Sequence, residues 1–164
     1  SKKLLDLDKA VYGIIDEVLY ADGEGVKHLH QVAGGSVKPA SHETVDAREH
    51  FIYQEGQAVF KWAVVKMAEA TEEILRRNNM TSQEINYLLP HQANMRIISA
   101  TGKRLELDNE KVLVNIEKYG NTTSATIPML MFENQHKFKK GDNLILTAFG
   151  AGFTWGAVLV KWAI

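Results

Sequence analysis

The hydrophobic and polar positions along the chain change their period several times, and each period predicts a type of secondary structure. From Glu55 to Asn78, apolar residues recur at steps of three and four, which predicts a long amphipathic helix. Its apolar stripe comprises Phe60, Ala63, Val64, Met67, Ala70, Ile74 and Leu75. Ala93–Leu105 has the same pattern and predicts a second helix. Asn121–Phe138 predicts a third, with Pro128 near its first turns or at a bend.

Short runs of β-branched, aromatic and other apolar residues predict strands between these helices. The predicted strands are Val11–Tyr20, His28–Ala33, Ile85–Leu89, Val112–Ile116, Asn143–Phe149 and Thr154–Trp162. The Asp22-Gly23 turn signal predicts that the first two strands pair antiparallel. The small residues 150–152 predict that the last two strands also pair antiparallel. Gly34–His50 is long and polar, which is typical of a binding loop or a mobile loop.

This order of elements, β-β-α-β-α-β-α-β-β, defines the fold class. It predicts an α/β domain in which helices cover a mixed sheet. Nothing in the sequence suggests a domain boundary, so residues 1–164 are expected to form one domain.

Charge and composition narrow the possible functions. The formal net charge is −1, so the basic residues are balanced by acids and nucleic-acid binding is not indicated. No apolar run approaches the ~18 residues of a spanning helix, and Ser1–Lys9 shows no secretory signal, so neither feature indicates a membrane. The chain has no cysteine, which excludes a disulfide or a thiol nucleophile within it and fits a cytoplasmic protein. His28 and His30 would share a strand face, but no third ligand is placed beside them, so we expect no metal site.

Two polar residues stand where strands are predicted to end. His91 directly follows Ile85–Leu89, and ligands of α/β sheets bind at the carboxyl ends of strands. By position alone, His91 is equally consistent with a cap for the next helix. Asn121 follows Val112–Ile116 and a glycine, where a helix N-cap is the more common role. Together, however, a histidine and an asparagine can both donate to one anionic oxygen while remaining neutral, which suits an oxyanion or an enolate.

Two further features have a structural and a functional interpretation. The turn at Ala151 is explained by a tight hairpin, but its main-chain amide is also a candidate oxyanion donor. The second predicted helix carries Arg96, Lys103 and Arg104 without an acid. This face is either solvated surface or a docking patch for an acidic partner. On the preceding helix, Glu72 precedes Arg76 and Glu73 precedes Arg77 by four residues, so we expect two surface ion pairs.

Three spaced motifs together resemble the C-terminal half of the 3-oxoacyl-[acyl-carrier-protein] synthase III family. They are PHQAN at Pro90–Asn94, GNTTS at Gly120–Ser124 and FGAGFTWG at Phe149–Gly156, and EGQAVFK at Glu55–Lys61 also matches. The resemblance implies one half of a thiolase-like fold, whose other half carries a cysteine. It also implies a decarboxylative Claisen condensation, in which an acyl group, typically acetyl, passes from acyl-CoA to that cysteine. The enolate from malonyl-acyl carrier protein then attacks the acyl-cysteine and gives 3-oxoacyl-carrier protein.

The resemblance also implies roles for individual residues. His91 and Asn121 match the histidine and asparagine of the family's Cys-His-Asn triad, and Ala151 matches its oxyanion turn. Asn94 matches a contact of the pantetheine arm, and Phe60 and Ala63 match the entry tunnel. The basic surface that receives acyl carrier protein is matched by Lys61, Arg96, Lys103 and Arg104. The partners implied are acyl carrier protein, acyl-CoA, the N-terminal half of the enzyme and a second copy in a homodimer, with no cofactor beyond the substrates.

The sequence departs from the family at two places. Ala151 stands where glycine is common, so its role requires that alanine tolerates the local φ. The cysteine-bearing half and the glycine-rich strand that usually precedes this half have no match, so we expect the chain alone to be inactive. Two alternatives remain open: a relative with another starter or carbon nucleophile, and a non-catalytic module that docks carrier protein.

Overall fold

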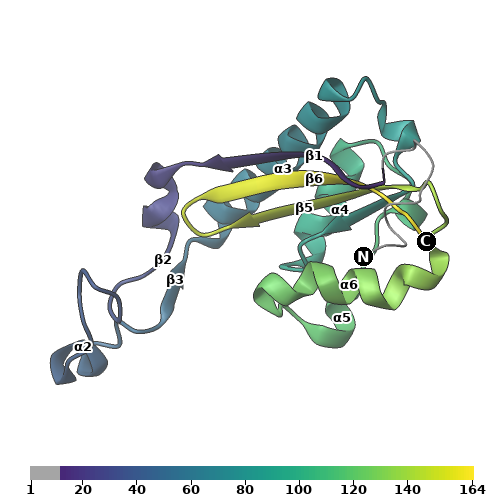
Figure 1. Ribbon diagram of the computed structural model, residues 1–164. Helices are drawn as coiled ribbons and strands as arrows, with labels where there is room; N and C mark the ends of the chain where they lie inside the picture. Colours follow the sequence, from purple (N-terminus) through teal and green to yellow (C-terminus); the bar gives the residue numbers. More distant parts are fainter. Residues whose placement is uncertain (1–11) are drawn as a thin grey trace.

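A computed structural model describes residues 12–164, so Val11, the first residue of the first predicted strand, lies outside the described residues. Its main sheet has the strand order β1-β6-β5-β4 (Figure 1). The strands are β1 (Gly13–Ala21), β4 (Tyr87–Pro90), β5 (Asn143–Gly150) and β6 (Thr154–Lys161). β6 runs antiparallel to both β1 and β5, whereas β4 runs parallel to β5. The mixed sheet and the antiparallel pairing of the last two strands are thus as predicted.

Helices cover both faces of this sheet. The long helix α3 (Gly56–Arg77) and the neighbouring helix α4 (Met95–Arg104) lie on one face, and α6 (Thr126–Asn134) lies on the other (Figure 1). Both predicted amphipathic helices therefore form, and α3 ends at Arg77 with Asn78 as its cap. The arrangement is the three-layer α/β architecture that the alternation of elements predicts.

Alternating side chains of the strands divide between the two faces. Leu88 of β4 packs in the cluster with Ile74 of α3, whereas the next residue, Leu89, packs with Leu130 of α6. Successive side chains of a strand point to opposite faces, so a fully buried strand reads as a continuous apolar run. All four of these residues are fully buried. Burying each such side chain stabilises the fold by about 1.5–3 kcal/mol.

The predicted hairpin between the first two strands is wrong. Asp22 caps a 3-10 helix, η1 (Gly23–His28), by accepting from the main-chain N–H of Glu24 at 2.9 Å. The chain therefore turns away from β1, and β2 (Leu29–Gln31) pairs instead with β3 (Ile52–Gln54). These strands form an arm that extends from the body of the molecule, with α2 (His42–Asp46) at its far end (Figure 1). The helix α2 lies inside the segment predicted as a loop.

The segment between α4 and β5 also differs from the prediction. Val112–Ile116 is not a strand: its main chain meets β4 only at a bridge between Leu88 and Val112, and then enters α5 (Ile116–Tyr119). The predicted helix over Asn121–Phe138 is divided into η4 (Thr123–Ala125), α6 and η5 (Gln135–Lys137). Pro128 lies in the first turn of α6, where its missing N–H costs no helical hydrogen bond. The remaining short turns are η2 (Ser82–Glu84), which has a capping box between Thr81 and Glu84, and η3 (Asn109–Lys111).

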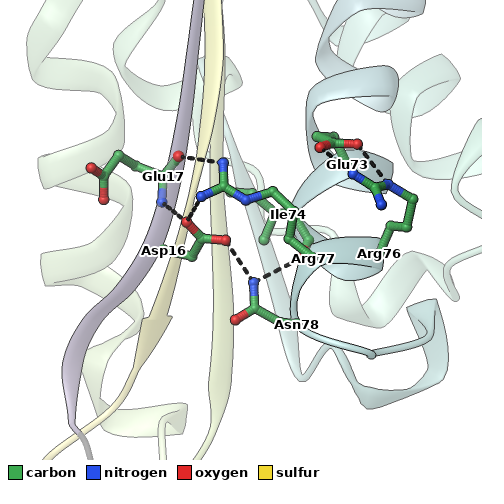
Figure 2. A network of polar contacts seen from close by, with 7 residues as sticks. All are labelled: Asp16, Glu17, Glu73, Ile74, Arg76, Arg77 and Asn78. Atoms are coloured by element: carbon green, nitrogen blue, oxygen red, sulfur yellow. Dashed lines mark hydrogen bonds and ion pairs between the residues drawn. The ribbon is translucent and has the colours of Figure 1, made fainter.

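An ion-pair network fastens the C-terminal end of α3 to the edge strand β1 (Figure 2). Arg77 donates to Asp16 at 2.6 Å and to the carbonyl of Glu17 at 3.2 Å. The other carboxylate oxygen of Asp16 accepts from the side-chain amide of Asn78 at 2.8 Å. Asp16 lies at an irregularity in the pairing of β1, and its side chain is only 14% exposed. The network thus joins two elements about sixty residues apart in sequence.

The predicted ion pairs along α3 are therefore wrong. Arg76 pairs with Glu73, three residues before it, at 2.7 Å, and Arg77 pairs with Asp16 rather than with Glu73. Both spacings of three and four place side chains on the same helix face, so spacing alone did not distinguish them. The tertiary partner on β1 could not be read from the helix.

We expect Asp16→Ala to lower the free energy of unfolding by about 1–3 kcal/mol, because several donors lose a charged acceptor that is largely buried. Urea unfolding followed by circular dichroism measures this change. The matched control is Glu73→Ala, which removes a carboxylate that is 31% exposed and pairs only within its own helix, and it should leave the midpoint nearly unchanged. Equal effects of the two substitutions would show that the Asp16 network does not fasten α3 to β1.

Candidate active site

The parallel pairing of β4 and β5 brings two candidate residues to one edge of the sheet. The ladder continues one residue beyond β4, where the N–H of His91 donates to the carbonyl of Thr147 on β5 at 2.8 Å. Three residues later β5 ends at Gly150, and the turn with Ala151 begins. Since both strands run in the same direction, His91 and Ala151 emerge at the same, carboxyl edge, where α/β sheets bind ligands.

An open cavity of about 1700 Å³ lies at this edge. Of the candidate residues, those that line it are Phe60, Ala63, His91, Asn94, Arg96, Asn121 and Ala151. The structure thus gathers residues from the α3 helix, the β4–α4 junction, the loop after α5 and the β5–β6 turn. Lys61, Lys103 and Arg104 are exposed and are not among the lining residues.

His91 is held by a hydrogen bond that the sequence did not reveal. Its Nδ1 lies 2.6 Å from the hydroxyl oxygen of Thr126, the first residue of α6. Thr126 is 2% exposed, and its hydroxyl has no other partner among residues 12–164. Because a buried hydroxyl hydrogen without an acceptor is costly, we assign Thr126 as the donor and Nδ1 as the acceptor. The proton of the neutral ring then lies on Nε2.

Burial keeps His91 in this neutral form. Desolvation disfavours the charged imidazolium and lowers the pKa of His91 below its ordinary value of 6.5. A neutral ring with Nδ1 already occupied has one remaining N–H, on Nε2. The local structure therefore makes His91 a hydrogen-bond donor rather than a general base at neutral pH.

Asn121 is oriented by its own loop. Its side-chain oxygen accepts from the main-chain N–H of Thr123 at 2.9 Å, two residues further along the chain. The N-cap of η4 is Thr122, so the prediction that Asn121 is a helix N-cap is wrong. A main-chain N–H can only donate, so this contact fixes which end of the amide is oxygen. The Nδ2 amino group has no protein acceptor within residues 12–164. The contact with Thr123 and a donor role thus use different atoms of Asn121, and the two are compatible.

The main-chain N–H of Ala151 is a third donor at this edge. The carbonyl of Ala151 accepts from the hydroxyl of Thr154 at 3.1 Å, whereas its N–H has no acceptor in the described part of the chain. Ala151 is not among the residues with positive φ, so alanine is compatible with this turn. The positive φ of the turn, 141°, falls on Gly152, where glycine is required.

Phe60, Asn94 and Arg96 lie together at the rim formed by α3 and α4. The guanidinium of Arg96 lies 5.1 Å from the centre of the Phe60 ring, a cation–π distance. Asn94 caps α4 by accepting from the N–H of Arg96 at 2.8 Å, and its amino group has no acceptor among residues 12–164. An aromatic face, an amide and a cation are therefore combined at the entrance to the cavity.

The predicted basic face continues outside the cavity. Lys61, Arg96, Lys103 and Arg104 are all exposed, and none pairs with a carboxylate within residues 12–164. Lys66 differs, because it pairs with Glu69 at 2.8 Å. The unpaired charges thus lie on two adjacent helices, α3 and α4, and Arg96 among them lines the cavity.

Sequence reasoning missed two residues that support the site. Thr126 is 35 residues from His91, and only the packing of α6 against β4 reveals their contact. Gln92 reads as a surface residue at a helix start, yet it is completely buried. Within residues 12–164, no three potential ligands converge on a metal position, and no helix is long and apolar enough to cross a membrane.

Comparisons with known proteins agree with this geometry. Residues 75–162 match the family model for the C-terminal part of 3-oxoacyl-[acyl-carrier-protein] synthase III. The chain is 56% identical, over 98% of its length, to a beta-ketoacyl-[acyl-carrier-protein] synthase III of Porphyromonas gingivalis and covers 48% of that protein. It is 55% identical, over 92% of its length, to a Bacteroides thetaiotaomicron synthase and covers 45% of it. The chain thus spans about half the length of these relatives.

Solved structures of such synthases have the same fold. Those from Aquifex aeolicus and Thermus thermophilus match over 94% of this chain, with TM-scores of 0.80 and 0.81 and identities of 36% and 37%. The chain covers 46% and 48% of them. The class is therefore one α/β half of a thiolase-like fold. The chain belongs to the 3-oxoacyl-[acyl-carrier-protein] synthase III family, in its C-terminal part.

We expect nuclear magnetic resonance to find His91 neutral, with its proton on Nε2, at pH 7. Its pKa should be lower in the folded chain than in urea, because burial penalises the charge. Below pH 6.5 the unfolded state then binds more protons. The stabilisation from neutral His91 is therefore complete above that pH and is lost as the pH falls through the folded pKa.

The variant Thr126→Val tests the tautomer in the same spectra. Without the hydroxyl, Nδ1 loses its donor, and the two neutral tautomers should both be populated. A proton found on Nδ1 in the unsubstituted chain would contradict the assignment of Thr126 as donor.

Proposed function

We propose that residues 1–164 are the C-terminal domain of a beta-ketoacyl-acyl carrier protein synthase III. The observation that carries this proposal is the convergence of His91, Asn121 and Ala151 on one cavity. The enzyme would start fatty acid synthesis by condensing an acyl-CoA, typically acetyl-CoA, with malonyl-acyl carrier protein. Its acyl-accepting cysteine belongs to the N-terminal half.

In this mechanism, the Nε2–H of His91 and the Nδ2–H of Asn121 donate to the thioester oxygen of the malonyl group. The bond between the malonyl α-carbon and its carboxylate breaks and releases carbon dioxide. The electron pair moves into the thioester as an enolate, whose oxygen the two donors stabilise. Neutral donors suit this step because their hydrogen bonds strengthen as negative charge develops on the thioester oxygen. They also transfer no proton to that oxygen.

The enolate carbon then attacks the carbonyl carbon of the acyl-cysteine. A carbon–carbon bond forms, and the carbonyl oxygen becomes an oxyanion that accepts from the N–H of Ala151. When this intermediate collapses, the carbon–sulfur bond breaks, and the cysteine leaves as a thiolate. The product is 3-oxoacyl-acyl carrier protein, and no cofactor takes part besides the two thioester substrates.

Substrate delivery uses the rim and the basic face. The pantetheine arm passes Phe60 and Ala63, and Asn94 donates to one of its amides. Acyl carrier protein, which is acidic, docks on Lys61, Arg96, Lys103 and Arg104. The unpaired state of these charges supports this role, because charges already neutralised by carboxylates would attract an acidic partner less.

The N-terminal half is the partner that completes the cavity. Leu19 and Tyr20 of the edge strand β1 line the cavity, although they are 77% and 42% exposed. Large apolar side chains at a cavity wall fit burial by another protein surface. We further propose that the complete enzyme is a homodimer in the cytoplasm.

The test is a chimera in which this chain replaces the corresponding half of the Porphyromonas gingivalis relative. The chimera should condense acetyl-CoA with malonyl-carrier protein, and the 164-residue chain alone should not. His91→Ala or Asn121→Ala in the chimera should each lower kcat by about 10²–10³-fold, as expected for an oxyanion donor. Turnover by the chain alone, or a folded chimera without activity, would contradict the proposal.

The docking role predicts a charge-dependent KM. In the chimera, the double substitution of Arg96 and Lys103 by glutamate should raise the KM for malonyl-carrier protein about 10-fold or more at low salt, with less effect at high salt. The KM for acetyl-CoA should change much less. The double substitution of Lys137 and Lys139 by glutamate, at exposed positions that precede β5, is the charge-matched control. A salt-independent effect, or an equal effect of the control, would exclude this docking surface.

A further inference from the structure

The side chain of Gln92, between β4 and α4, is buried and fully hydrogen bonded. Its Oε1 accepts from the main-chain N–H groups of Asn115 and Ile116 at 3.0 and 3.1 Å. Its Nε2 donates to the carbonyl of Pro90 at 2.8 Å and to that of Leu113 at 3.4 Å. An amide has two donor and two acceptor positions, so all of them are used. Most of these contacts reach the segment that leads into α5.

Helix α5 depends on such contacts, because it has only four residues. Isolated helices this short are unstable in water. Asn115 precedes it but forms no side-chain cap of its own. The Oε1 of Gln92 takes the place of that cap, since it accepts from the first N–H groups of the helix. The position of α5 is therefore set by the residue that follows His91 in the chain.

A second anchor, Glu133 on α6, holds the same short helix. One carboxylate oxygen accepts from the side-chain amide of Asn115 at 2.9 Å. The other accepts from the ammonium of Lys118 at 2.6 Å and from the hydroxyl of Tyr119. The Lys118 ammonium, then these hydroxyl and amide donors, lower the pKa of Glu133 to about 2, so it is ionised at neutral pH. Both ends of α5 are thus fastened to other elements.

The loop that carries Asn121 needs this support because its main chain is strained. Thr123, two residues after Asn121, has a φ of 54°, whereas the φ of 65° at Gly120 is one that glycine adopts freely. A positive φ is unfavourable for a β-branched residue such as threonine. Such a conformation persists only where the surroundings determine it strongly. The helix α5, which Gln92 and Glu133 hold in place, directly precedes this loop and fixes where the loop begins.

We propose that Gln92 and Glu133 are positioning residues that, through α5, hold the amide of Asn121 at a fixed position relative to His91. Neither side chain lines the cavity, so each acts on the chemistry only through the loop. This inference rests on the proposed function for its kinetic consequence, whereas its structural consequence is independent of activity.

The kinetic test uses the chimera and separates its two half-reactions. Glu133→Ala and Gln92→Met should lower kcat for malonyl-carrier protein decarboxylation by about 10–100-fold, since small displacements of a catalytic group have effects of this size. Transfer of the acetyl group to the cysteine should change less than about twofold, because it does not use Asn121. Glu73→Ala, which removes a carboxylate of α3 that pairs with Arg76, is the control and should affect neither.

A double-mutant cycle distinguishes positioning from general destabilisation. In the Asn121→Ala background, Glu133→Ala should cause no further loss of decarboxylation, because the group that it positions is already absent. If the two substitutions instead multiply, or if both half-reactions fall together, the inference is wrong. Glu133→Ala decides the question if Gln92→Met does not fold.

Hydrogen exchange in the 164-residue chain gives the independent structural readout. Glu133→Ala should raise the exchange rate of the Thr123 amide, which donates to Asn121, by about 10-fold or more, while amides of β5 keep theirs. An unchanged Thr123 rate would overturn the inference even if the chimera is active. An inactive unsubstituted chimera with this exchange pattern would refute the proposed function and leave the positioning role standing.

Discussion

The parallel pairing of β4 with β5 is the contact on which the candidate site depends. It continues to the hydrogen bond from His91 to Thr147, and it directs His91 and the Ala151 turn to one edge of the sheet. An antiparallel pair would place them at opposite edges. On the two faces of the sheet, β4 packs between α3 and α6, where Thr126 contacts His91 and Gln92 contacts the segment before Asn121.

The surroundings of the site favour neutral donors over charged ones. Burial lowers the pKa of His91, and the Thr126 hydroxyl leaves its proton on Nε2. The amide of Asn121 cannot titrate, and its oxygen is occupied by Thr123. Charge is instead concentrated outside, on the exposed face of α3 and α4. This separation suits a reaction in which negative charge develops inside while an acidic carrier binds at the surface.

Most helices and strands of the main sheet, and several residues that line the cavity, could be predicted from the sequence because their signals are local. The apolar period gave α3 and α4, and the apolar runs gave β4, β5 and β6. The three motifs gave residues that the fold gathers around one cavity. The predictions that failed concerned contacts between residues far apart in the sequence, or residues with more than one possible partner. The Asp22-Gly23 turn caps η1 rather than a hairpin, Arg77 prefers Asp16 to Glu73, and Thr126 and Gln92 reveal their partners only in the packed structure.

In the proposed enzyme, this chain stabilises the enolate, whereas the nucleophile belongs to the other half. The most direct measurement is malonyl-carrier protein decarboxylation by the chimera after its cysteine is replaced by alanine. The account predicts that decarboxylation continues without the cysteine and falls by about 10²–10³-fold when His91 is also replaced by alanine. Decarboxylation that is unaffected by the loss of His91 would contradict it.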